Sequence, residues 1–145
     1  MAIVKDLVIT VNGKDAKVSN NVFLYLGDGA VTLMITVLEK NSLFGTIDSA
    51  TNLVSENNTV YARVCVLKSN NELVYSDKCE IRGGKIRFTI SKEFIDEIAE
   101  GGQHLLQIHM YDDEYEGANR LTIPPVTINI LQPICDIGHD KSDTP

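Results

Sequence analysis

Apolar and polar residues alternate along most of the chain, which is the pattern of β-strands with one buried and one solvated face. The alternation is clearest in the segments 7–11, 31–37, 60–66, 86–90 and 106–110. Segment 31–37 is apolar enough on both faces to be a central strand. Turn-forming residues separate the segments, at Asn12-Gly13, Ser69-Asn70-Asn71 and Gly83-Gly84. Seven or more short strands at this spacing predict an all-β fold, an antiparallel β-sandwich with Greek-key-type connections.

One segment has the period of a helix instead. Ser91 is a suitable N-cap, and acidic residues follow it in the first turns. The apolar residues that follow share one helical face, and Gly101-Gly102 ends the pattern. These apolar residues are Phe94, Ile95, Ile98 and Ala99. The sequence therefore predicts one short helix at about residues 92–100.

Three stretches interrupt the regular pattern. Residues 40–58 are rich in Asn, Ser and Gly, so we expect a long connection with one short strand. Pro124-Pro125 separates two late strands and predicts a kink or a change of sheet, because proline cannot donate to a ladder. After Gln132 the apolar pattern ends, and we expect a domain at 1–132 followed by a polar, disordered tail at 133–145.

Composition and charge narrow the function. The chain has 145 residues, enough for one domain, and a formal charge of −7 from 20 acidic and 13 basic residues. No cluster of Lys or Arg offsets this charge, so we expect neither nucleic acid nor an anionic membrane surface as a partner. No apolar run approaches the roughly 20 residues of a membrane span. The N-terminus lacks the pattern of a secretion signal, so we expect no export by the general secretory route.

The cysteines favour a structural role. Cys65, Cys79 and Cys135 are too scattered for a metal knuckle, and we expect free thiols in a reducing compartment. A Cys65–Cys79 bridge between neighbouring strands stays open as the alternative. We expect Cys65 to be buried within a strand, while Cys79 lies near a strand end and its exposure stays open.

No group of residues points to catalysis. The sequence contains no GxSxG, HExxH or phosphate-loop motif. We expect His104 at a strand start, His109 on a half-exposed strand face with Gln107 and Tyr111, and His139 in solvent in the tail. None of them is paired with a nucleophile, so we expect no enzyme, no catalytic residue and no cofactor.

Two ligand-binding alternatives remain. The acidic run 112–117 could chelate calcium, with Asp6, Asp28 or Asp48 completing a site, although contiguous acids cannot all point inward and a solvated hairpin loop fits better. We therefore expect no metal site. A carbohydrate-binding module would use aromatic rings, but tryptophan is absent and aromatic residues make up 6% of the chain. Five tyrosines keep this alternative open: Tyr25, Tyr61, Tyr75, Tyr111 and Tyr115.

Three segments carry a more specific pattern. The first runs from Gly102 to Asp113, passes the acidic loop, and continues from Asn119 to Val126 through the string Arg-Leu-Thr-Ile-Pro-Pro. The others are Tyr25–Leu33, where a strand enters a Gly-Asp-Gly turn, and the helical stretch Ser91–Glu100. Together they resemble the N-terminal domain of tailed-phage baseplate upper proteins, over most of residues 3–132.

The resemblance implies an immunoglobulin-like sandwich that anchors a tail-fibre or receptor-binding component to a phage or prophage baseplate. It implies other baseplate and tail proteins, and copies of the chain itself, as partners. The expected location is the virion tail, after synthesis in the cytoplasm of the bacterial host. Members of the family are normally longer, so we expect either an excised domain, cut near the tail, or a short relative.

Four large side chains are candidates for partner contact. They lie on the wetter face of the strand 105–111 or on the loop beside it. They are Leu105, His109, Tyr111 and Tyr115. The alternative is that a second sheet or the short helix covers them.

Overall fold

A computed structural model of the chain describes residues 3–20, 22–28, 31–41, 49–55, 58–98, 101–115 and 117–134. These residues form a mostly β fold with one short helix. The strands are β1 (Ile3–Asn12), β2 (Asp15–Val18), β3 (Phe23–Tyr25), β4 (Val31–Asn41), β5 (Ser49–Asn52), β6 (Tyr61–Leu67), β7 (Leu73–Tyr75), β8 (Cys79–Arg82), β9 (Lys85–Ile90), β10 (Gly102–Tyr111), β11 (Arg120–Thr122) and β12 (Val126–Leu131). The helix is α1 (Lys92–Ile98).

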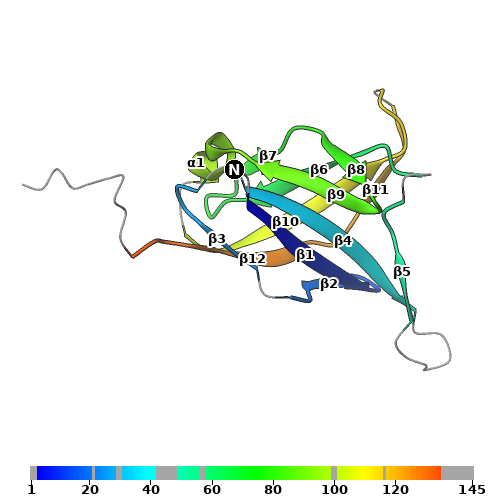
Figure 1. Ribbon diagram of the computed structural model, residues 1–145, viewed down its shortest axis with the longest axis horizontal. Helices are drawn as coiled ribbons and strands as arrows, with labels where there is room; N and C mark the ends of the chain where they lie inside the picture. The colour runs from blue at the N-terminus through cyan, green and yellow to red at the C-terminus, as the bar shows by residue number, and fades with distance from the viewer. Residues whose placement is uncertain are drawn as a thin grey trace, which may run out of the picture.

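The strands are hydrogen-bonded into a single, strongly curled sheet. Its path is β2-β1-β4-β9-β8-β6-β10-β12-β3, with β5 on β4, β7 on β6 and β11 on β10. The curl makes β1, β4 and β9 one layer and β6, β10 and β12 the layer behind it (Figure 1). Strand β8 joins the two layers because it pairs with both β9 and β6. On the open side of the curl, β2 lies against β12.

The sheet is mixed, so the prediction of antiparallel pairing throughout is wrong at two places. β1 pairs with β4 in parallel, with Ile3 opposite Val31, and β12 pairs with β3 in parallel, with Asn129 opposite Phe23. Between β1 and β4 the chain turns back as β2 and crosses to the far end of the path as β3. Alternation of apolar residues shows which face is buried but not the direction of the neighbouring strand, so the sequence did not reveal these pairs.

The inward side chains of both layers form one core, as the alternation predicted. In β4 the buried residues are Val31, Leu33, Ile35 and Val37, and β4 lies between β1 and β9 as a central strand. The facing layer contributes Leu106, Ile108 and Met110 from β10 and Ala62, Val64 and Val66 from β6. Burial of these side chains is the main favourable term in folding.

The predicted helix and tight turns are confirmed. The Ser91 Oγ accepts a hydrogen bond from the backbone N–H of Phe94 at 3.1 Å, which is the geometry of an N-cap. Phe94 packs edge-on against Phe88, with ring centroids 5.2 Å apart. Between β8 and β9, Gly83 and Gly84 have φ of 61° and 74°, the left-handed values that a two-residue hairpin requires. Residues 99 and 100 of the predicted helix lie outside the described residues.

Pro124-Pro125 produces a kink but no change of sheet. β11 and β12 pair with the same edge of β10, with Leu121 opposite Met110 and Val126 opposite Leu106. Five steps along β11–β12 thus match four steps along β10, which is the signature of a bulge. The Ile123 N–H still donates to the Ile108 carbonyl at 2.9 Å.

Two further predictions concern segments that the structure describes only in part, residues 40–58 and 133–145. The short strand expected within residues 40–58 is β5. β12 ends at Leu131, and of the predicted tail only Pro133 and Ile134 are among the described residues. No helix in the described ranges is long and apolar enough to cross a membrane.

The core position of Ile35 gives a direct test of this fold. Ile35 is fully buried, so Ile35→Ala is expected to lower the free energy of unfolding by about 2–5 kcal/mol. Thr36→Ala, on the outer face of the same strand, is the control and is expected to change it by less than about 1 kcal/mol. Urea denaturation followed by circular dichroism measures both. Equal effects of the two substitutions would contradict the assignment of the inner face.

Candidate interaction surface

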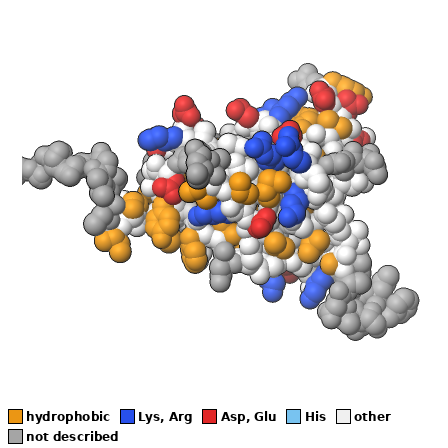
Figure 2. All heavy atoms as spheres, in the orientation of Figure 1, with side chains coloured by type: hydrophobic (Ala, Val, Ile, Leu, Met, Phe, Trp, Pro, Cys, Tyr) orange, Lys and Arg blue, Asp and Glu red, His pale blue; other side chains and the backbone are white. Residues whose placement is uncertain are grey.

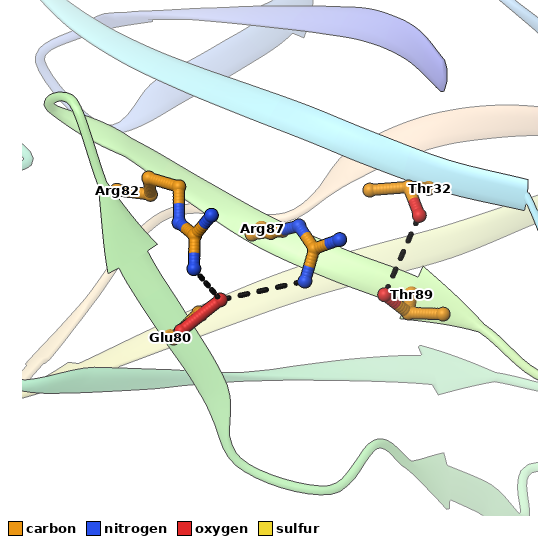
Figure 3. Close-up of polar contacts among 5 residues, drawn as sticks. All are labelled: Thr32, Glu80, Arg82, Arg87 and Thr89. Carbon is orange, nitrogen blue, oxygen red and sulfur yellow. Dashed lines mark hydrogen bonds and ion pairs between the residues drawn. The ribbon is translucent and has the colours of Figure 1, made fainter. Parts of the chain in front are cut away.

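The outer face of β8 and β9 is polar and internally paired. Glu80 Oε2 accepts hydrogen bonds from Arg82 at 2.9 Å and from Arg87 at 3.4 Å, and Thr32 lies 3.4 Å from Thr89 across the strands (Figure 3). Charged side chains of both signs stand together over β8 and β9 (Figure 2). Exposed ion pairs of this kind contribute little to stability, but they keep the face solvated.

The outer face of the other layer carries a row of three leucines. Leu67 of β6 lies opposite Leu73 of β7 on one side and opposite Leu105 of β10 on the other. Leu73 is 49% exposed and Leu105 is 43% exposed, although neighbouring side chains on a solvated sheet face are normally polar. Tyr75, also exposed, extends this leucine row along β7. The leucine row is thus an apolar patch that faces water.

A pair of stacked tyrosines lies further along the same two strands. Tyr61 of β6 is opposite Tyr111 of β10, with ring centroids 4.6 Å apart and an interplanar angle of 13°. The Lys78 Nζ lies 4.5 Å from the Tyr61 ring centroid and donates to the Glu114 carbonyl at 3.1 Å. One face of Tyr61 is therefore covered by its partner ring, and a cation sits over Tyr61 as well.

His109 lies between the leucine row and the tyrosine pair. Its Nδ1 is 2.9 Å from the Thr122 Oγ1, and in register it is opposite Arg63, whose Nη1 donates to the Ser76 carbonyl at 3.1 Å. Burial lowers the pKa of His109 below its usual value of 6.5, and the nearby charge of Arg120 lowers it further. His109 is therefore held as a neutral, hydrogen-bonded part of the surface.

The four predicted contact residues divide between one strand and one loop. Leu105, His109 and Tyr111 follow one another along the outer face of β10, as the alternation predicted. Tyr115 is on the loop after β10 and is 64% exposed. Leu105 and Tyr115 are exposed to solvent. His109 contacts Thr122, and Tyr111 stacks on Tyr61. Their role in partner contact stays a prediction.

Sequence reasoning missed the other half of this surface. The period of two places Tyr61, Arg63 and Leu67 on one face of β6, but nothing in the sequence shows that β6 lies beside β10. Leu73 was missed for the same reason, since β7 is a short strand that extends the face beyond β6.

Both described cysteines are free and buried. Cys65 is buried as expected, and Cys79, for which exposure was left open, is buried as well. Cys79 begins β8, and its Sγ lies 3.6 Å from both the Ser76 Oγ and the Asp77 carbonyl. Burial raises the pKa of both thiols, which disfavours the thiolate that a nucleophile needs. Cys135 lies outside the described residues.

His104 lies at the start of β10, as expected. It is the third residue of β10, and its side chain is buried opposite Ile128 of β12. His139 lies outside the described residues.

The first two carboxylates of the acidic loop accept hydrogen bonds from residues of the same loop. The Asp112 carboxylate accepts hydrogen bonds from both the backbone N–H and the Nδ2 of Asn119, each at 2.9 Å. Asp113 Oδ1 accepts the N–H of Glu114 at 2.7 Å. Across the described ranges, no three His, Cys, Asp or Glu side chains are grouped to hold a metal ion. Glu116 and Asp48, which the calcium alternative also invoked, lie outside those ranges.

The tyrosines do not form one flat platform. Tyr61 and Tyr111 stack on each other, while Tyr25, Tyr75 and Tyr115 lie on β3, on β7 and on the acidic loop. Sugar rings bind to free aromatic faces, so this arrangement gives the carbohydrate alternative no specific support.

The fold is similar to that of a phage protein domain. The sequence matches no protein-family model and no curated protein. Among solved structures, the "N-terminal domain of phage TP901-1 ORF48" matches with a TM-score of 0.54 over 90% of this chain and 98% of that chain, at 10% sequence identity. The likeness confirms, at the level of the fold, the resemblance inferred from the sequence. Function does not follow from fold alone.

The setting of His109 predicts its titration. Its pKa is expected below 6.5, so the unfolded chain binds the proton more readily, and stability contributed by neutral His109 is lost as the pH falls below 6.5. Arg120→Gln is expected to raise the pKa of His109, while Arg82→Gln, on the other layer, leaves it unchanged. NMR titration of the imidazole measures both. A pKa at or above 6.5 in the unsubstituted chain would show that the imidazole is not desolvated.

Proposed function

We propose that this chain is a structural module of a phage or prophage tail baseplate. It anchors a tail-fibre or receptor-binding component through protein–protein contacts and performs no catalysis. The fold-level likeness to a phage protein domain and the Arg120–Pro125 string support this proposal. The exposed leucine row is the observation that carries it, because a module of this kind acts through an apolar surface.

The leucine row and its surroundings have the composition of a binding surface. Leucines lie at its centre and Tyr75 extends them along β7, while Arg63 and Arg120 lie further along the same face, opposite His109 and Tyr111. Protein interfaces have an apolar centre and a polar rim, and Tyr and Arg are enriched among the residues that dominate binding. The partner that fits is a tail protein with an apolar patch bordered by acidic groups, which would meet the two arginines.

The remaining parts of the proposal follow from the resemblance. The module is made in the cytoplasm of the bacterial host and resides in the virion tail, where it contacts other baseplate proteins and copies of itself. Its domain spans residues 1–132, and residues 133–145 are a polar tail. We further propose that the fold is immunoglobulin-like. Two facing layers enclose one core, although β8 joins them into one sheet.

The proposal predicts that the chain travels with phage particles. When the prophage or phage is induced in its host, the tagged chain is expected to co-sediment with purified tails in a density gradient. Leu105→Asp is expected to lower the amount per particle about tenfold or more, because a charge at the centre of an interface opposes desolvation. Thr89→Asp, at an exposed position of β9 on the opposite layer, is the matched control and is expected to leave the amount per particle unchanged.

Two outcomes would overturn the proposal. The chain would be no tail component if it stayed in the unassembled fraction while tails formed normally. The leucine row would not be the docking surface if Leu105→Asp and Thr89→Asp were incorporated equally.

A further inference from the structure

A groove lined by both apolar and polar side chains lies at the open side of the curled sheet, between β2 and β12. Its volume is about 410 Å³, and it is lined from β2 by Ala16 and Val18 and from β12 by Ile128. At its base it reaches the core leucines Leu7 and Leu106. This seam groove exists because β2 and β12 approach each other without pairing. A side chain entering it would lie against the hydrophobic core.

The seam groove differs in charge from the rest of the protein. Its lining contains Lys17 and no Asp or Glu, although the chain as a whole carries a formal charge of −7. A second ammonium lies close by, since Lys5 Nζ donates to the backbone carbonyl of Phe23, another lining residue, at 2.7 Å. The groove therefore fits an apolar or aromatic side chain that has carboxylates beside it.

The loop after β10 presents such a group. Tyr115 is 64% exposed, and Asp113 and Glu114 directly precede it. Among the described residues around Tyr115, two hydrogen bonds join Asp112 to Asn119, and the Ala118 N–H donates to the Tyr115 carbonyl at 3.2 Å. Hydrogen bonds that already tie these described residues reduce the conformational entropy lost on binding, so the exposed Tyr115 ring is suited to insertion.

The loop of one molecule is far from the groove of the same molecule. Gln103, near the start of β10, lines the groove, whereas the loop follows Tyr111 at the end of β10. The eight residue steps from Gln103 to Tyr111 span about 26 Å, at about 3.3 Å per residue. Figure 1 shows the loop at the upper right of the domain and β2 and β12 along its lower side. A loop that fills the groove must therefore come from another copy.

We propose that the seam groove binds the Tyr115 loop of a second copy of this chain. The Tyr115 ring enters the groove, and Asp113 and Glu114 meet Lys17 and Lys5 at its mouth. The two surfaces are different, so the contact is head-to-tail and builds a ring if the rotation closes or an open chain if it does not. The inference deepens the copy-to-copy contact of the proposed function and uses a surface separate from the leucine row.

Sedimentation velocity of the full chain over a range of concentrations tests this contact. The chain is expected to associate, and Tyr115→Ala and Lys17→Glu are each expected to weaken association about tenfold or more. Lys14→Glu, in the turn before β2 but outside the groove lining, is the control and is expected to behave as the unsubstituted chain. Thermal melts establish that each variant is folded.

A charge exchange makes the test specific. Asp113→Lys with Glu114→Lys is expected to weaken association, and combining this pair with Lys17→Glu is expected to restore most of it. A chain that stays monomeric at every concentration, or an association that Lys17→Glu and Tyr115→Ala leave unchanged, would overturn the inference. Loss of association in Leu105→Asp alone would assign self-contact to the leucine row instead. Incorporation into tails is measured separately, so failure here leaves the proposed function standing.

Discussion

The structure depends on burying the inner faces of one curled sheet in a single core. The side chains of β4 and β9 in one layer meet those of β6 and β10 in the other, and β8 joins the layers by pairing with both. Because side chains alternate along a strand, this burial also decides which residues face outward. The outward positions are the ones from which the proposed function is argued.

The two outer faces of the sheet carry different kinds of side chain. Over β8 and β9, Glu80 pairs with two arginines and the face is polar. Over β6 and β10 the outward positions hold Leu67, Leu105 and the stacked Tyr61 and Tyr111. Exposed leucines do not help the core, which is why the proposed docking surface is placed on this face.

Local patterns predicted the parts of this fold that local forces decide. The strands, the Ser91 helix cap and the Gly83-Gly84 turn each depend on neighbouring residues and were predicted. The parallel β1–β4 pair and the burial of Cys79 depend on which strands meet across the sheet, and no single sequence shows this. The same reason explains why only part of the candidate surface was predicted. The alternation of residues along β10 predicted that Leu105 faces outward, whereas the place of Leu73 beside it depends on the pairing of β6 with β7.

The most direct test of the account is a cryo-electron microscopy map of the phage tail tip that contains this chain. The account predicts that the fold is found there with the leucine row of β7, β6 and β10 buried against another tail protein, and with the polar β8–β9 face in solvent. A map in which the leucine row faces solvent, while the β8–β9 face makes the contact, would contradict it.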